Sequence, residues 1–238
     1  MRVLRQVVLL SLLLPLQAVA QTTLLRAARM FDPATGTLSG PVSVLIEAGR
    51  IRELNPAQPP AGAAVIELGD MTLLPGLIDM HSHLTADLLG DWVNRPVRET
   101  IADAALRGAR NARRTLLAGF TTVRDVGSPG FADVSLMNAI DRGDLDGPRI
   151  FPAGHPISIT GGHCDVTGYA PGILERGPEQ GVADGPDEVV KAVRYQVKHG
   201  AKLIKVCATA GVLSFEGPVG AQQLSDAELR AAVEEAAR

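Results

Sequence analysis

The sequence is poor in aromatic residues, lysine and cysteine, and these shortages narrow what the protein can be. Phe, Tyr and Trp make up only 3% of its 238 residues, which argues against a surface that stacks nucleic-acid bases. The formal net charge is −3, so nucleic acid is not expected as a partner. With 46% hydrophobic and 21% charged residues, the chain is typical of a globular protein of one or two domains.

The sequence also lacks an apolar run long enough to span a bilayer well. Its N-terminal apolar run, 7–16, follows two arginines and is short for a membrane helix. Ala18-Val19-Ala20 then fits the small-x-small pattern of a signal peptidase site. We predict a signal peptide over residues 1–20, export to the periplasm or outside the cell, and no stable membrane anchor. An uncleaved N-terminal anchor is the alternative.

The chain has two cysteines, Cys164 and Cys207. Export would allow a disulfide between them, but two cysteines far apart in sequence do not establish one. We expect free or buried thiols.

Residues 21–72 are expected to form a small β domain. Three segments within it mix β-branched and apolar residues and are separated by turn signals: 23–31, 43–55 and 64–72. Three short strands bury little surface by themselves. We therefore expect them to need a partner layer.

The chain is organised around the stretch 73–83, which is typical of a buried strand ending in two histidines. Side chains alternate faces along a strand, so Asp79, His81 and His83 point the same way. Two imidazoles placed in this way can bind one divalent metal ion such as zinc. The alternative is a pair of surface histidines near a strand end.

The stretch Pro-Gly-Leu-Ile-Asp-Met-His-Ser-His at 75–83 resembles the first-strand signature of the metal-dependent amidohydrolase superfamily. Its exported Xaa-Pro dipeptidase-like members are the most similar. The resemblance implies a (β/α)8 TIM barrel with metals at the carboxyl ends of its strands, preceded by a β-sandwich. It also implies that a metal-bridging hydroxide attacks the carbonyl carbon of the substrate.

Residues 73–238 alternate between strand and helix patterns. Strand patterns follow the histidines at 121–127, 148–153 and 203–208, and helix patterns occur at 96–118, 133–142, 187–199 and from 225 onward. Four such units make about half of an eight-unit barrel. We expect the N-terminal half of a longer protein, inactive alone, because the family takes two further histidines and an aspartate from later strands. A natural truncated product or a dimerising half-barrel is the alternative.

Lys205 is the second metal-ligand candidate. The sequence has 19 arginines and only four lysines, and an unpaired ammonium inside an apolar strand is costly. The stretch 200–214 resembles the fourth strand of binuclear amidohydrolases, where the matching lysine is carboxylated by CO2 and its carbamate bridges two metals. Lys202 has the opposite strand parity and is the weaker candidate. A snorkelling or ion-paired lysine is the alternative.

His163 is the third candidate. The stretch 158–165 resembles the loop after the third strand of the Xaa-Pro dipeptidase-like members, although these commonly have glycine where Cys164 stands. We expect His163 to bind substrate or to contact the bridging water; a loop-ordering hydrogen bond is the alternative. His155 is a weaker candidate, and His199 is interpreted as structural.

The resemblance to the amidohydrolase superfamily implies a metal-dependent hydrolase that cleaves an amide C–N bond in a dipeptide or an acylated amino acid. His81, His83 and Lys205 would hold two divalent ions, with zinc favoured, and no catalytic acid or base is assigned within the chain. A cyclic-amide, ester or phosphoester hydrolase is the first alternative, and a non-catalytic periplasmic binding module is the second. Asp79, Arg124 and Asp125 are not assigned a role, and homo-oligomerisation stays open.

Overall fold

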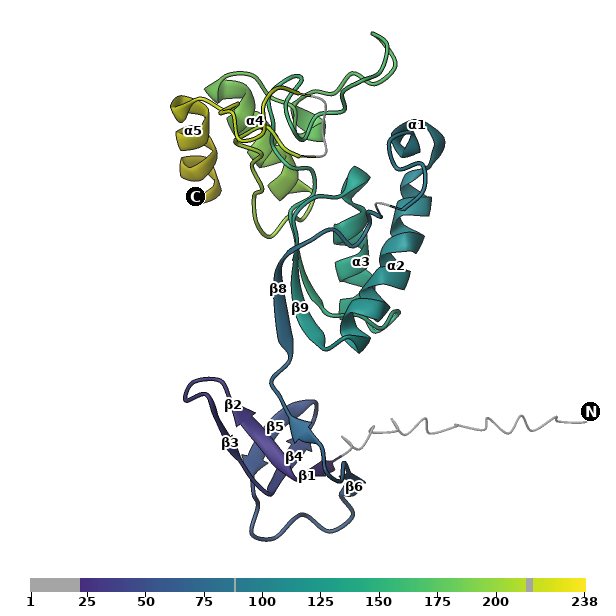
Figure 1. Cartoon of the computed structure of the whole chain (residues 1–238), viewed down its shortest axis with the longest axis vertical. Coiled ribbons are helices and arrows are strands. Elements are labelled where there is room, and N and C mark those ends of the chain that lie inside the picture. Colours follow the sequence, from purple (N-terminus) through teal and green to yellow (C-terminus); the bar gives the residue numbers. More distant parts are fainter. Residues whose placement is uncertain (1–21, 88, 213–215) are drawn as a thin grey trace, which may run out of the picture. The chain divides into compact units, whose positions relative to one another are not determined.

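The computed structural model describes residues 22–87, 89–212 and 216–238. The chain divides into two compact units, Met1–Pro75 and Gly76–Arg238 (Figure 1). The expected signal peptide, 1–20, lies outside the described residues. No helix in the described part of the chain combines the length and apolar character needed to cross a membrane.

The first unit consists of two small β-sheets. One has the strand order β5-β4-β1-β6 and the other the order β3-β2-β7. The strands are β1 (Thr23–Ala27), β2 (Arg29–Asp32), β3 (Thr37–Ser39), β4 (Val42–Glu47), β5 (Arg50–Leu54), β6 (Ala64–Glu67) and β7 (Thr72–Leu73). Ala27, Val42 and Val44 are buried between the sheets, where Met30 and Leu73 pack against them. Each predicted segment therefore supplies strands, but the chain changes sheet after Ala27 and divides the first segment into two.

The second unit contains a parallel sheet of three strands in the order β10-β9-β8. These are β8 (Leu77–Ser82), β9 (Phe120–Asp125) and β10 (Arg149–Pro152). Asp125 at the end of β9 is paired with Ser82 on one side and Pro152 on the other. The three strands therefore end at one edge, and loops from all of them meet there. The described residues form an open sheet and no closed barrel.

Helices follow these strands in the alternating pattern that the sequence predicts. They are α1 (Arg95–Arg98), α2 (Ile101–Leu117), α3 (Ala132–Asp141), α4 (Pro186–Lys198) and α5 (Asp226–Ala236). The helices α2 and α3 bury one face of the sheet around Ala112, Val123, Leu136 and Ile150. A second core joins α4 and α5 through Val189, Val193 and Ala232. The unit thus has a mixed α/β fold.

One predicted helix, 96–118, is divided into α1 and α2. The first ends at Arg98, with Glu99 as its C-cap. Thr100 caps the second: its Oγ1 accepts from the amide of Asp103 at 3.3 Å, and Asp103 Oδ2 accepts from the amide of Thr100 at 2.8 Å. This capping box starts a new helix because it satisfies amides that the first turn leaves unpaired. Ser225 and Glu228 form the same motif and begin α5, where the sequence predicts a helix from 225 onward.

The prediction that β8 is buried is wrong for this structure. Leu77, Ile78 and Met80 are 46%, 61% and 52% exposed. In the described part of the chain β8 has a strand partner on one side only, β9. An apolar strand pattern predicts the strand but does not reveal which of its sides are covered.

The predicted fourth strand, 203–208, is also wrong in its extent. It is reduced to an isolated parallel bridge between Ile157 and Val206, with amide-to-carbonyl distances of 2.8 Å from Ile157 to Lys205 and from Cys207 to Ile157. The next residue in register on the neighbouring segment is His155, and its amide donates to Gln196 Oε1 at 2.9 Å. The ladder therefore does not continue from Lys205 toward Leu203.

Candidate functional site

His81 and His83 lie together at the carboxyl end of β8, as the alternating strand pattern predicts. Their ring centroids are 5.4 Å apart. The amide of His81 donates to Asp79 Oδ1 at 2.9 Å, and His83 Nδ1 lies 3.1 Å from the carbonyl oxygen of Gly127. The loop that follows β9 therefore orients the ring of His83.

The surroundings of His83 favour its neutral form. Burial lowers the pKa of His83, and the positive charges of His81, Lys205 and His163 lower it further, against the raising effect of the Gly127 carbonyl. A carbonyl oxygen can only accept, so Nδ1 carries the proton that points to Gly127. Nε2 then keeps the lone pair that a metal ion would need.

Asp125 binds the backbone on both sides of the His83 ring. Its carboxylate accepts from the amide of Leu84 at 3.0 Å and from the amide of Gly127 at 3.4 Å. The side chain is fully buried, and burial, together with the nearby buried Asp133, raises the pKa of Asp125 to about 7. One carboxyl thus fixes both backbone segments that flank the His83 ring. Its position at the end of the strand pattern 121–127 is the sequence signal for this role, although no role was assigned to it from sequence.

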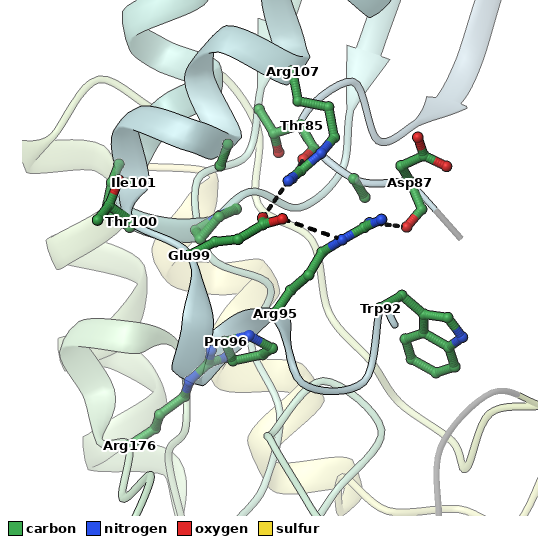
Figure 2. A pocket seen from close by; sticks show the side chains of 13 residues that line it. Thr85, Asp87, Trp92, Arg95, Pro96, Glu99, Thr100, Ile101, Arg107 and Arg176 are labelled. Carbon is green, nitrogen blue, oxygen red and sulfur yellow. Dashed lines mark hydrogen bonds and ion pairs between the residues drawn. The ribbon is translucent and has the colours of Figure 1, made fainter. Parts of the chain in front are cut away.

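A cavity of about 290 Å³ opens beside this edge (Figure 2). Thr85 and Ala86, which follow His83 by two and three residues, line it together with Pro129 from the loop after β9. The same strand ends that carry His83 and Asp125 therefore lead directly into the cavity. It was not predicted from sequence, because its walls come from separate segments.

Lys205 lies half-buried on the bridge beside Ile157. Burial lowers the pKa of its ammonium, and the positive charge of Arg124 lowers it further. Lys205 is among the charges that act on His83. The charges of His81 and Lys205 therefore both act on His83. Lys205 gives up its proton more readily than a solvent-exposed lysine does.

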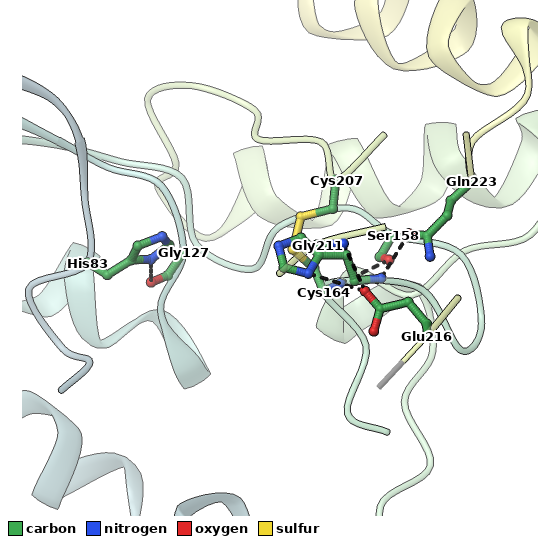
Figure 3. The surroundings of a disulfide bond; sticks show 9 residues. His83, Gly127, Ser158, Cys164, Cys207, Gly211, Glu216 and Gln223 are labelled. Carbon is green, nitrogen blue, oxygen red and sulfur yellow. Dashed lines mark hydrogen bonds and ion pairs between the residues drawn. A yellow bond between two sulfur atoms is a disulfide. The ribbon is translucent and has the colours of Figure 1, made fainter. Parts of the chain in front are cut away.

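The expectation of free thiols is wrong: Cys164 and Cys207 form a disulfide (Figure 3). Their Cα atoms are 6.0 Å apart, although 43 residues separate them in sequence. Cys164 follows His163 directly, and Cys207 is two residues after Lys205. The crosslink therefore ties the His163 loop to the Lys205 segment. Only the tertiary path of the chain brings these sulfurs together.

His163 is held by a carboxylate and by a close backbone approach. Its Nδ1 lies 3.3 Å from Oε1 of Glu216, a largely buried acid, and its amide donates to Gln223 Oε1 at 2.9 Å. A Cβ atom at Gly211 would come within 2.0 Å of the imidazole, so glycine leaves the space that the ring occupies. Glu216 and Gln223 carry no motif, and sequence reasoning missed both.

The other two histidines are structural in their contacts. His155 is buried; its Nε2 accepts from the amide of Gly130 at 3.0 Å and its Nδ1 lies 3.1 Å from Gln196 Oε1. Burial lowers the pKa of His155, which suits a neutral ring with both nitrogens engaged. The ring of His199 packs 4.7 Å from Phe131, centroid to centroid. The role proposed for His199 agrees with this packing.

The donor set suits a divalent metal but is incomplete within the described residues. There, no three or more His, Cys, Asp and Glu side chains are grouped so as to hold a metal ion. The candidates offer two imidazoles and a lysine, and a lysine is a ligand only when its ammonium charge is removed. His81, His83 and Lys205 are thus chemically compatible with metal binding as part of a larger ligand set.

Comparison with known proteins points to one family. The sequence profile of the amidohydrolase family matches residues 72–238. Ochratoxinase from Aspergillus niger is 36% identical over 183 residues, which cover 70% of this chain and 37% of that protein. The crystal structure of the A. niger enzyme has a TM-score of 0.75 at 30% identity, and the match covers 92% of this chain and 54% of that one.

A Xaa-Pro dipeptidase crystallised with methionine bound is also similar, with a TM-score of 0.84 and 36% identity over 91% of this chain and 54% of that one. A prolidase in complex with N-methylphosphonate-L-proline gives 0.81 and 34%, with the same coverage. The present chain spans about half the length of these solved relatives. Because the profile match extends over more than half of the residues, this chain belongs to the amidohydrolase family.

Proposed function

We propose that the protein, at its natural length, is a metal-dependent hydrolase that cleaves an amide C–N bond in a dipeptide or an acylated amino acid. One observation carries this proposal: His81 and His83 lie together at the carboxyl end of β8 in an amidohydrolase chain. The ring of His83 has its Nδ1 proton committed to Gly127. An imidazole pair fixed in this way is suited to coordinating a metal ion.

His81, His83 and Lys205 would hold two divalent ions, with zinc favoured because imidazole is one of its preferred ligands. When bound, such ions lower the pKa of a water molecule and polarise the carbonyl of the substrate. The chain contributes the orientation of the ligands. Asp125 and Gly127 fix the His83 ring, and the disulfide fixes the segment that carries Lys205.

We propose that Lys205 is carboxylated. Its neutral amine nitrogen forms a bond to the carbon of CO2, and one proton is released to solvent, which leaves an anionic carbamate. The lowered pKa of Lys205 raises the fraction of neutral amine. The product replaces a partly buried positive charge by two oxygen ligands, which removes an unfavourable charge from the site.

His163 is proposed to bind the substrate. Glu216, Gln223 and the absence of a side chain at Gly211 define the position of its ring. The substrate class is supported by the names of the relatives, a Xaa-Pro dipeptidase, a prolidase and an ochratoxinase. Because a shared fold does not determine the substrate, we propose the class of bond and leave the particular acyl and amine groups to experiment.

We also propose that the enzyme works outside the cytoplasm. The pattern of residues 1–20 is that of a cleaved signal peptide. The Cys164–Cys207 disulfide suits an oxidising compartment, since cytosolic thiols are generally kept reduced. Detection of the protein in a periplasmic or secreted fraction, with a mature N-terminus at Gln21, would test this proposal. A cytoplasmic protein retaining Met1 would contradict it.

Metal content and hydrolysis of a panel of dipeptides and N-acyl amino acids test the central proposal. We expect about two metal ions per natural-length chain, and Lys205→Ala should remove most of this metal and the hydrolysis. Lys202→Ala is the matched control, because Lys202 lies three residues away with an exposed side chain. Lys205→Arg should stay metal-poor in bicarbonate, since a guanidinium forms no carbamate. Full metal loading of Lys205→Ala would overturn the carbamate assignment.

The panel also separates the alternatives. Hydrolysis of cyclic amides, esters or phosphoesters, without amide hydrolysis, would favour the first alternative. A metal-free protein that binds small molecules without turnover would favour the binding module. Residues 1–238 alone are proposed to be inactive, because they span about half the length of the solved relatives; amide hydrolysis by that purified segment would contradict this.

A further inference from the structure

The cavity beside the β8 edge has apolar walls. Trp92, Pro96, Ile101 and Ala104 line it from α1, α2 and the preceding loop, and its volume is about 290 Å³. A concave, mostly apolar cavity with a few polar groups is the usual form of a small-molecule site. None of His81, His83, His163 and Lys205 lines it.

The charged groups at one end of this cavity form a network (Figure 2). Glu99 pairs with Arg95, at 3.5 Å between Nε and Oε1, and with Arg107. The carboxylate of Asp87 pairs with Arg110 at 3.1 Å. Three guanidinium groups thus share two carboxylates, and Asp103 is a third acid whose charge interacts with Arg107, so the network is balanced in charge.

Arg176 adds a positive charge that the network does not balance, and in this it differs from these arginines. Its side chain lines the same cavity and also a second one of about 370 Å³, so it lies between the two. Among the described residues, no hydrogen bond or ion pair to its guanidinium is formed. Asp165 and Tyr169 are the acidic groups whose charges it feels, but burial dominates and lowers the pKa of Arg176.

Arg176 is half-buried, and a guanidinium in such a place loses part of its hydration without gaining an acceptor in return. A carboxylate is its natural complement, since the planar fork of arginine matches two carboxylate oxygens. The adjacent apolar walls would cover the rest of such a ligand. Because the network is balanced, the charge of Arg176 favours an anion and disfavours a cation at this place.

We propose that this cavity binds an organic carboxylate, with its charged group on Arg176 and its apolar body against Trp92. The carboxylate can come from two sources, the amide substrate itself or a separate small acid. Thr85 and Ala86 connect the cavity to His83 through two and three residues of chain, so either ligand would lie beside the β8 end. Carboxylate binding itself does not depend on hydrolysis.

Titration of the natural-length protein with phenylacetate tests the proposal directly. Trp92 lines the cavity, so a fluorescence change that Trp92→Phe abolishes reports on the cavity, and calorimetry gives an independent dissociation constant. We expect saturable binding below about 10 mM, which is reasonable for so small a ligand. Arg176→Gln should weaken it by about 10- to 100-fold, and Arg176→Lys, which keeps the charge but loses the fork, should bind with intermediate strength.

Two controls make the result specific. Arg142→Gln removes an exposed arginine that pairs with Asp144 and should leave binding unchanged. Phenylacetamide has the same apolar body without the charge and should bind the wild-type protein about tenfold more weakly or worse; this comparison decides the matter even if Arg176→Gln does not fold. Equal binding of acid and amide, equal binding by a folded Arg176→Gln, or no binding of phenylacetate would overturn the proposal.

Kinetics distinguish the two sources once a substrate is known. If the cavity takes the substrate's own carboxylate, phenylacetate competes with substrate and Arg176→Gln raises KM. If it takes a separate acid, phenylacetate changes kcat at saturating substrate. Both outcomes support the carboxylate site. If a metal-free, inactive protein still binds phenylacetate, the carboxylate site is supported even where the proposed hydrolysis is not.

Discussion

The two sides of the candidate site are held by different means. His81 and His83 are carried by a regular strand, and their neighbourhood is fixed by hydrogen bonds to Asp125 and Gly127. His163 and Lys205 lie in irregular segments, and the disulfide between Cys164 and Cys207 joins these two segments. Hydrogen bonds to a buried carboxyl organise the first side, and a disulfide organises the second.

The difference follows from how many backbone partners each side has. β8 forms a parallel ladder with β9, so a few hydrogen bonds at its end suffice to orient His83. The Lys205 segment has only the bridge to Ile157, and a segment with few hydrogen bonds opens readily. A crosslink compensates for this by restricting the unfolded chain. The first side should therefore respond to pH and the second to reduction.

The largest expected effect is on the disulfide side. Cys164→Ala opens a crosslink that spans 43 residues and should lower the free energy of unfolding by about 2–4 kcal/mol. Urea denaturation measures this loss. A reducing agent should destabilise the wild-type protein similarly and leave Cys164→Ala unchanged. If both proteins unfold at the same urea concentration, the disulfide does not stabilise the second side and the comparison fails.

The next effect is the pH dependence of the β8 side. The pKa of Asp125 is raised to about 7 by burial and by Asp133, so between its unfolded value and pH 7 the folded state retains a proton that the unfolded state has lost. Stability is therefore greatest at acidic pH and falls as pH rises to 7, at up to about 1.4 kcal/mol per pH unit.

Asp125→Asn should reduce this decrease in stability with rising pH. Urea denaturation from pH 4.5 to 8, in the presence of a chelator, measures the free energy of unfolding of both proteins. Exposed Asp144 provides the control, because Asp144→Asn should leave the slope as it is. A wild-type slope that Asp125→Asn reproduces would contradict the role of this carboxyl. Asp133, whose pKa burial also raises, should account for part of the remaining slope.

The smallest effect concerns the ring of His163. Gly211→Ala would place a Cβ atom 2.0 Å from this imidazole, and the ring must move away from Glu216. We expect a loss of about 1 kcal/mol and a changed imidazole NMR signal for His163, with that of His83 unaffected. Gly177→Ala is the control, since nothing lies within 4 Å of the added atom. An unchanged His163 signal would show that the ring is not held in this way.

Local patterns predicted much of the chain. The positions of β9, β10, α3, α4 and α5 follow from runs of apolar residues and from capping signals, both of which act over a few residues. The Thr100–Asp103 box was an equally local signal that was overlooked, and it divides α1 from α2. The pairing of His81 with His83 was predictable because strand alternation places both on one face.

Contacts between distant segments could not be predicted in the same way. The Cys164–Cys207 bond, the contact of Glu216 with His163 and the cavity beside Arg176 each join residues from separate loops. The short bridge at Lys205 depends on Gln196, whose side chain takes the amide of His155 away from the ladder. Such features are decided by where loops of the folded chain meet, and no periodicity in the sequence records that.

By itself the sequence determined the strand that presents His81 and His83, the alternation of strands and helices, and the resemblance that indicates the family. These depend on side-chain spacing along the backbone, which is a local property. Only the tertiary structure decided that the apolar side chains of β8 stay exposed, that Asp125 is buried where it binds the backbone next to His83, and that a disulfide holds the Lys205 segment. Burial and long-range bonding depend on which elements pack together, and packing is a property of the whole fold.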